Sequence, residues 1–196
     1  MPRRPTRTAA TLILHSWQGS GPEHWQSWLA ARLRDSEREV RYPDLPDPDS
    51  PSLERWLAAL RTNLAGLPDG GFDVLAHSLG VVLWLHHATA AGDWPRPARV
   101  ALVAPPSPQT TIPEMASFFP VPLDVTAVRR AAGGTVLVGG DDDPMAPEGI
   151  AAAYGRPLKM PTTIIEGGAH LNTAAGYGAW PAVLDWCGRD NLAFIA

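Results

Sequence analysis

The sequence predicts an α/β fold, a three-layer α/β/α sandwich in which helices cover both faces of a mostly parallel sheet. Short apolar runs of strand length alternate along the chain with segments of helical periodicity, which is the order that builds βαβ units. Several of these runs are continuous stretches of Val, Leu and Ile, as expected for strands that are buried on both faces. The 196 residues, 45% hydrophobic and 18% charged, suit one domain with a substantial core.

The expected elements follow this alternation. Strands are expected over residues 11–14, 39–42, 72–76, 100–104, 135–138 and 162–165. Helices are expected over residues 22–34, 52–64, 79–91, 147–154 and 180–188. Ser52 stands at the N-cap position of the second helix, before an apolar stripe at helical spacing. We expect residues 10–196 to form the single domain and residues 1–9 a flexible tail.

Prolines set residues 105–134 apart from the regular alternation. They rule out a long helix or a central strand, and they stand at Pro105, Pro106, Pro108, Pro113, Pro120 and Pro122. The segment is therefore expected to be an excursion with short helices between two strands. It is too short for a separate lid domain, and we expect it to form part of a pocket wall at the ligand-binding end of the sheet.

Charge and composition exclude several classes of protein. The formal net charge of -4 and the pI near 5.8 give no basic surface for nucleic acid. No apolar stretch approaches the ~20 residues of a membrane span, and no secretion signal follows the first arginines. The lone cysteine, Cys187, has no disulfide partner and is expected to be a buried, inert thiol. These observations predict a cytoplasmic protein without nucleic-acid or membrane partners; they do not indicate its oligomeric state.

The strongest chemical signal is the segment over residues 74–82. An apolar strand enters a small-x-Ser-x-Gly turn, with Ala76 and Gly80 on either side of Ser78, and an apolar helix follows at once. This is the pattern of a nucleophile elbow, in which the Ser hydroxyl is exposed on a strained turn above a helix N-terminus. The alternative is an ordinary helix N-cap serine. The flanking strand and helix favour the elbow.

A serine nucleophile needs a base and an orienting carboxylate. In the α/β-hydrolase arrangement the chain order is Ser, acid, His, and both partners follow late strands. Residues 135–138 precede Asp141, Asp142 and Asp143, and residues 162–165 precede His170. Asp143 is favoured as the acid because it lies in a Gly-x-x-Asp-Pro-x-x-Pro pattern whose second proline, Pro147, would start a helix. Asp142 is the alternative acid, and Asp141 is expected to cap a turn or face solvent.

The loop after the first strand is expected to complete an oxyanion hole. We assign its two amides to Trp17 and Leu79, with Ser16 as the alternative to Trp17. His15 and Ser16 are further expected to bind substrate or support this loop. Trp17, Phe118 and Phe119 are candidates for an apolar acyl pocket, against simple core or loop packing. His77 is expected to point away from Ser78 and to pack or form a hydrogen bond behind the elbow. His24 is expected to start a helix or line the entrance, and His86 and His87 to be structural.

Five local motifs together resemble the serine hydrolases similar to retinoblastoma-binding protein nine, a family of compact α/β-hydrolases. The motifs lie over residues 15–25, 42–46, 76–80, 142–144 and 168–181, in the family's order and across nearly the whole chain. The resemblance implies a lidless domain with a Ser–Asp–His triad at Ser78, Asp143 and His170. Ser16 departs from the pattern, because the family more often has Gly after the His of its first loop.

These residues predict a serine hydrolase that cleaves a small ester, thioester or amide through an acyl-enzyme on Ser78. Such chemistry requires no metal or organic cofactor, and the expected partner is a small acyl substrate. Two alternatives remain open from the sequence: an acyltransferase or cyclase that uses the same triad, and a catalytically silent module that binds a ligand or a protein.

Overall fold

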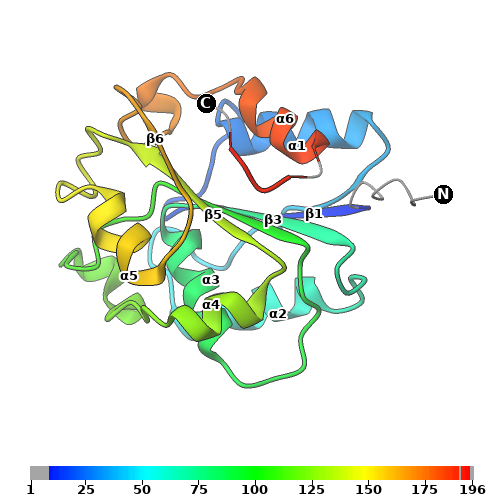
Figure 1. Cartoon of the computed structure of the whole chain (residues 1–196), viewed down its shortest axis with the longest axis horizontal. Coiled ribbons are helices and arrows are strands. Elements are labelled where there is room, and N and C mark those ends of the chain that lie inside the picture. The colour runs from blue at the N-terminus through cyan, green and yellow to red at the C-terminus, as the bar shows by residue number, and fades with distance from the viewer. Residues whose placement is uncertain (1–8, 190, 195–196) are drawn as a thin grey trace.

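The computed structural model describes residues 9–189 and 191–194 and contains a six-stranded, wholly parallel sheet (Figure 1). The strand order is β2-β1-β3-β4-β5-β6. The strands are β1 (Ala10–Leu14), β2 (Glu39–Arg41), β3 (Phe72–His77), β4 (Arg99–Val103), β5 (Thr135–Gly140) and β6 (Thr162–Ile165). The expected α/β sandwich with an open parallel sheet is confirmed. All but residue 9 of the expected tail lies outside the described residues.

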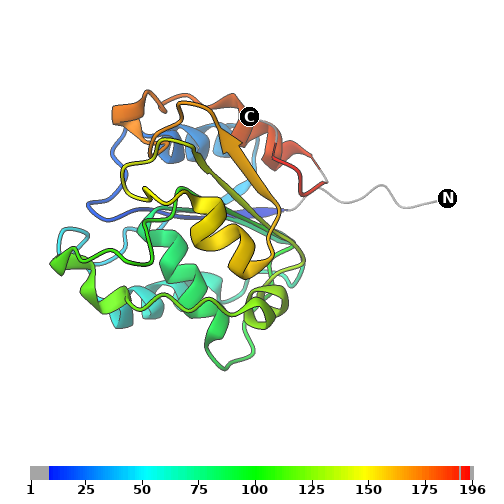
Figure 2. The ribbon, with the colours of Figure 1, turned by 60° about the vertical axis from the view of Figure 1, so that its left-hand side comes forward.

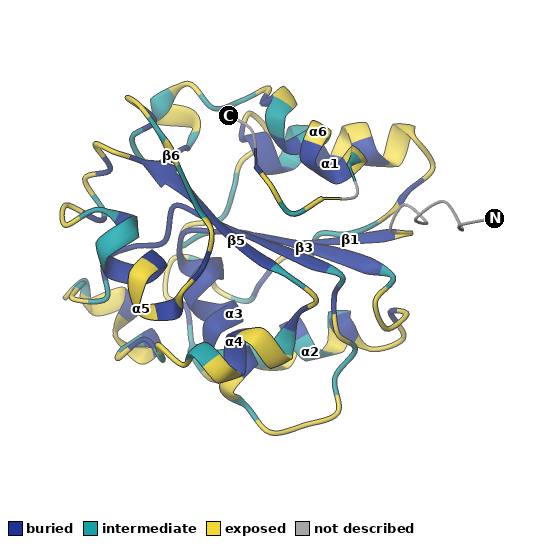
Figure 3. Cartoon of the chain, in the orientation of Figure 1, coloured by how far each residue is buried: buried dark blue, intermediate teal, exposed yellow. Residues whose placement is uncertain are grey.

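Helices cover both faces of the sheet, as Figures 1 and 2 show from two sides. Helices α1 (Trp25–Asp35) and α6 (Pro181–Gly188) lie on one face, and α2 (Leu53–Leu64), α3 (Leu79–Thr89) and α4 (Val125–Ala131) on the other. The short α5 (Arg156–Leu158) packs beside α4. Alternate residues of the central strands enter two separate apolar clusters, one under each helical layer. The central strands β1, β3, β4 and β5 are accordingly buried throughout in Figure 3, which explains their apolar runs, whereas the edge strands β2 and β6 are partly exposed.

The boundaries differ from the expected ones where capping or turn geometry intervenes. Helix α1 begins at Trp25 because the His24 side chain accepts a hydrogen bond from the Gln26 N–H as an N-cap. Ser52 occupies the N-cap position of α2, but its side chain makes no capping hydrogen bond. The helix expected over residues 147–154 begins later than Pro147 in the structure. Gly149 has a φ of 77°, in the left-handed region, so helical structure starts only beyond it and passes through the π-helix η2 (Ala151–Gly155) into α5.

The proline-rich segment forms the 3₁₀-helix η1 (Pro113–Phe118) and then α4, as the expectation of short helices requires. It leaves the sheet after β4 and returns to it at β5, so its first part lies at the carboxyl end of the strands. Asp124 caps α4 by accepting hydrogen bonds from the N–H groups of Thr126 and Ala127. Among the helices of the described chain, none has the length and apolarity needed to cross a bilayer.

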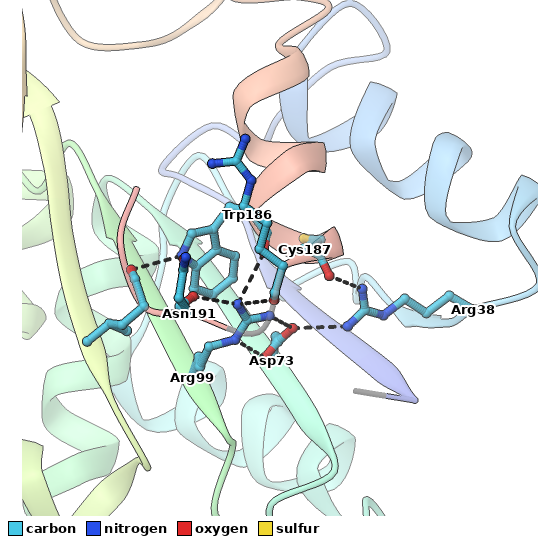
Figure 4. A network of polar contacts seen from close by, with 8 residues as sticks. Arg38, Asp73, Arg99, Trp186, Cys187 and Asn191 are labelled. Carbon is cyan, nitrogen blue, oxygen red and sulfur yellow. Dashed lines mark hydrogen bonds and ion pairs between the residues drawn. The ribbon is translucent and has the colours of Figure 1, made fainter. Parts of the chain in front are cut away.

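A buried ionic cluster fastens α6 to the sheet near the amino ends of β3 and β4 (Figure 4). Asp73 of β3 is fully buried and accepts hydrogen bonds from the guanidinium groups of Arg38, at 3.0 Å, and Arg99, at 2.7 and 3.1 Å. The Arg99 guanidinium lies 4.3 Å from the ring centre of Trp186 in α6. The two arginines also donate to backbone carbonyls at or after the end of α6, those of Trp186, Cys187, Arg189 and Asn191. The carboxylate thus holds two cations that bind the C-terminal segment.

We expect the Asp73→Asn substitution to lower the free energy of unfolding by about 3 kcal/mol, because it leaves two buried guanidinium groups without their counter-charge. Asp35→Asn is the matched control. Asp35 pairs with Arg32 at 3.2 Å on the surface, where both side chains are more than half exposed, and its loss should change stability by about 0.5 kcal/mol or less. Urea unfolding of both variants measures the difference; equal effects would contradict the role of the cluster.

Candidate active site

Ser78 stands at the sharp turn between β3 and α3. Its φ of 52° and ψ of -119° place a non-glycine residue in a strained conformation, as the elbow pattern predicts. Its N–H still donates to the carbonyl of Val103 in the neighbouring strand β4, so the turn follows the sheet without a break. Gly80 allows the helix to come close: a Cβ there would lie 2.7 Å from the carbonyl oxygen of His15. Gly80 of the motif is therefore a packing requirement.

The structure brings three distant side chains into one hydrogen-bonded chain. Nε2 of His170 lies 2.9 Å from Oγ of Ser78, and Nδ1 lies 2.8 and 3.0 Å from the carboxylate oxygens of Asp143. The Asp143 side chain is almost completely buried, and its Oδ1 also accepts the N–H of Met145. Because a carboxylate only accepts hydrogen bonds, the neutral imidazole carries its proton on Nδ1. Nε2 is then the basic nitrogen, and it faces the Ser78 hydroxyl.

The three consecutive acids have different partners. Oδ1 of Asp141 accepts the N–H of Gly167 at 2.8 Å, and Oδ1 of Asp142 accepts the N–H of Ala169 at 2.7 Å. Only Asp143 of the three contacts the imidazole of His170 in the described structure. Adjacent side chains point in different directions, so two acids brace the backbone of the loop and the third orients the ring.

The loop after β1 turns beside the elbow. The hydroxyl of Ser16 lies 2.9 Å from the carbonyl oxygen of Gly19 and 3.1 Å from that of Trp17, which closes the turn. His15 lies beneath the loop, where its Nδ1 donates to the carbonyl of Ser16 and its Nε2 accepts the N–H of Leu45. Ser16 and Trp17 line the cavity that contains Ser78, whereas His15 lines a neighbouring one. His15 therefore supports the loop from behind.

A cavity of about 430 Å³ opens above Ser78. One group of its lining residues is apolar and comprises Trp17, Met115, Pro144 and Met145. The polar group includes Gln18, Ser20, His24, Asn172 and Thr173. The lining residues of this cavity include no Lys, Arg, Asp or Glu, and the described chain has no cluster of three or more His, Cys, Asp or Glu side chains suited to a metal ion.

The two phenylalanines suggested for an acyl pocket do not line this cavity. Phe118 is fully buried against Trp56, with ring centres 5.3 Å apart, and Phe119 packs on the same core. Met115, one 3₁₀-helical turn earlier in η1, takes the position expected for them. Sequence reasoning also missed Met145 and Thr173, although each lies within three residues of Asp143 or His170, a proximity that could have indicated them.

Two further histidines, His24 and His77, pack near His170. The ring centre of His77 lies 5.1 Å from that of His170 and 4.9 Å from that of His24. Burial is the main cause that lowers the pKa of His24 to about 4, and proximity to His170 lowers it further. Burial likewise holds the pKa of His77 well below its ordinary value, with His170 and His24 adding to the effect. Both rings are therefore neutral at pH 7.

Comparisons with known proteins agree with this geometry. The family model described as serine hydrolase matches residues 11–188. The Bacillus subtilis protein YdeN is 23% identical over 181 residues, which cover 91% of this chain and 94% of YdeN. Its crystal structure has a TM-score of 0.80, at 22% identity, and covers 92% of this chain and 97% of its own. A monoacylglycerol lipase from Paleococcus ferrophilus has a TM-score of 0.66 at 14% identity and covers 91% of this chain and 93% of its own, a likeness of fold.

The depressed pKa of His24 predicts a loss of stability in acid. The unfolded chain takes up a proton near pH 6.5, whereas the folded chain does so only near pH 4, so stability falls as the pH drops through this window. Asn at position 24 keeps a capping acceptor but does not titrate. Between pH 7 and 5 the unfolding free energy of the unsubstituted protein should fall by on the order of 1–2 kcal/mol more than that of His24→Asn. Urea unfolding at both pH values measures this, and equal losses would refute it.

Proposed function

Because the chain belongs to the serine hydrolase family and is a hydrolytic enzyme, we propose that it cleaves a small ester, thioester or amide through an acyl-enzyme on Ser78. His170 is the proposed general base and Asp143 the carboxylate that orients it. One observation carries the proposal: the hydrogen-bonded chain from Asp143 through His170 to Ser78, with the hydroxyl on a strained elbow above the N-terminus of α3.

The proposed reaction has two halves. Nε2 of His170 takes the proton of Ser78 while Oγ attacks the acyl carbon, and the resulting imidazolium, stabilised by Asp143, then protonates the leaving group. A water molecule, deprotonated by the same nitrogen, attacks the acyl-enzyme and restores the serine. In both halves the N–H groups of Leu79 and Trp17 would stabilise the oxyanion. Leu79 is the first residue of α3, where N–H groups have no acceptor within the helix, and Ser16 is the alternative donor to Trp17.

The lining of the cavity supports the proposal that the substrate is uncharged. No charged side chain is among its lining residues, and its two buried histidines, His24 and His77, are neutral at pH 7. A carboxylate or ammonium group on the substrate would lose hydration there without gaining a counter-charge. We therefore place an apolar acyl chain against Trp17, Met115 and Met145, and a neutral polar part of the substrate against Asn172 and Thr173.

Within the family, we propose that this chain resembles the proteins similar to retinoblastoma-binding protein nine. The support is the run of matching motifs, from the loop at residues 15–25 to the segment at residues 168–181. The cytoplasmic location, the single domain over residues 10–196 and the lack of nucleic-acid and membrane partners stay predictions from composition and charge.

Labelling with a fluorophosphonate probe, followed by mass spectrometry of the modified peptide, tests the nucleophile. We expect the label on Ser78 and none on Ser78→Ala. We expect kcat/KM for a p-nitrophenyl ester to fall by about 10³-fold or more in Ser78→Ala and His170→Ala, with the fold retained. Asp143→Asn should lose about 10²-fold or more, because it disturbs the tautomer of His170.

Asp142→Asn is the matched control for the orienting acid. Its side chain binds the N–H of Ala169 and the Asn oxygen can still accept that bond, so activity should stay within about tenfold. A label on another residue, or wild-type turnover in Ser78→Ala or His170→Ala, would exclude the mechanism. Absent labelling and turnover in the unsubstituted protein would favour a silent binding module, and ester or amide products formed with an added alcohol or amine would favour acyl transfer.

Esters matched in size but differing in charge test the substrate class. We expect p-nitrophenyl butyrate to exceed the p-nitrophenyl monoester of succinate in kcat/KM by about tenfold or more, because the succinate carboxylate has no partner in the cavity. Thr173→Arg places a cation on the lining and should narrow the difference. Faster hydrolysis of the succinate ester by the unsubstituted enzyme would disprove the neutral-substrate proposal.

A further inference from the structure

His170 lies on a strained loop between β6 and the 3₁₀-helix η3 (Thr173–Ala175). The residues on either side of it, Ala169 and Leu171, have φ values of 42° and 47°, in the left-handed region. A non-glycine residue in this region is strained and persists only where the surrounding structure holds it. The position of the imidazole therefore depends on whatever fixes the backbone of this loop.

Four side chains bind the loop backbone, from two directions. Asp141 and Asp142, which follow β5, accept N–H groups of the loop as described above. On the interior side, Nε2 of His77 lies 3.0 Å from the carbonyl oxygen of His170, and Nε1 of Trp25 donates to the carbonyl of Leu171 at 2.9 Å. The two interior donors thus hold consecutive carbonyl groups, at the reactive histidine and at the residue after it.

His77 is well placed to act as a fixed hydrogen-bond donor to the carbonyl group of His170. The side chain is buried and its ring lies between those of His24 and His170. Because a carbonyl oxygen only accepts hydrogen bonds, the single proton of the neutral ring is on Nε2. Trp25 packs edge-on against the same ring, with centres 5.8 Å apart, so the two donors also support each other.

We propose that His77 and Trp25 are positioning residues: by holding the carbonyl groups of His170 and Leu171 they keep the imidazole within hydrogen-bond reach of Ser78. The proposal rests on the proposed role of His170 as the base. Neither side chain needs to touch the reacting atoms for this, and a base displaced by about 1 Å can lose on the order of 10²-fold in rate.

A histidine elsewhere in the molecule supplies a matched control. Nε2 of His86, in α3, lies 2.8 Å from the carbonyl oxygen of Phe118, so it makes the same type of bond to the backbone of η1. Removing the imidazole at position 86 deletes a comparable hydrogen bond without affecting the loop of His170. A merely structural role for His77 predicts similar kinetic effects at both positions.

The experiment compares His77→Leu, His77→Gln and His86→Leu in the full-length enzyme, by kcat, KM, the rate of fluorophosphonate labelling and thermal unfolding. We expect His77→Leu to lower kcat and the labelling rate by about 10- to 100-fold, with KM within about threefold. His77→Gln should recover most of the loss, because its amide nitrogen can take the place of Nε2. His86→Leu should stay within about threefold of the unsubstituted enzyme.

Wild-type kcat in folded His77→Leu, or an equal loss in His77→Leu and His86→Leu, would overturn the proposal, as would a failure of His77→Gln to recover activity. If His77→Leu does not fold, Trp25→Phe provides the test, because it removes only the donor to Leu171 from an aromatic side chain. We expect its kcat to fall about tenfold, and unchanged kcat would count against the proposal. His170→Ala distinguishes a failure of this proposal from a failure of the proposed function. If His170→Ala retains activity, His170 is not the base and the proposed function itself is wrong.

Discussion

Helix α3 approaches the end of strand β1 so closely at Gly80 that a side chain there would meet the carbonyl oxygens of Leu14 and His15 at 2.7–2.8 Å. This contact places the elbow of Ser78 directly beside the loop that follows β1. The proposed oxyanion donors, the amides of Trp17 and Leu79, come from these two segments and would separate if the helix moved outward. The absence of a Cβ at Gly80 thus allows the proposed nucleophile to lie close to the proposed donor, Trp17, in the loop after β1.

The fold was largely predictable because its pattern is local. The expected strand ranges agree with the structure to within two residues at each end. Apolar runs indicate the central strands, because burial on both faces leaves little room for polar residues. The edge strands β2 and β6 are short and partly exposed, and their sequences are more polar. The strand order and register depend on pairing between segments far apart in the chain. The periodicity of the sequence carries no information about that pairing. The helix near Pro147 starts late because Gly149 has a positive φ. The presence of a glycine in the sequence allows that conformation but does not require it, so the late start could not be predicted.

The arrangement of the candidate site was predictable in part, for the same reason. Ser78 and His170 follow apolar strands within recognisable turns, so the topology brings them to one edge of the sheet. The choice among three adjacent acids, and between Phe118 and Met115 as lining residues, depends on side-chain directions in irregular segments. The hydrogen bonds from His77 and Trp25 to the His170 loop join segments that are 93 and 146 residues apart, so no local sequence pattern predicts these partners.

Several strained backbone positions gather beside the proposed site, although strain is not confined to it: Glu37 and Lys159, before β2 and β6, also have positive φ. Toward the carboxyl ends of the strands, non-glycine residues with positive φ include Gln18, Ser78, Ala169 and Leu171, all at or beside the proposed site. Toward the amino ends of β3 and β4, the chain is fastened by the buried cluster around Asp73. Strained residues persist only where the rest of the fold determines their conformation. The sheet and its anchored C-terminal helix supply such surroundings, so the opposite end can hold the proposed nucleophile, the proposed base and their loops in conformations that isolated segments would not adopt.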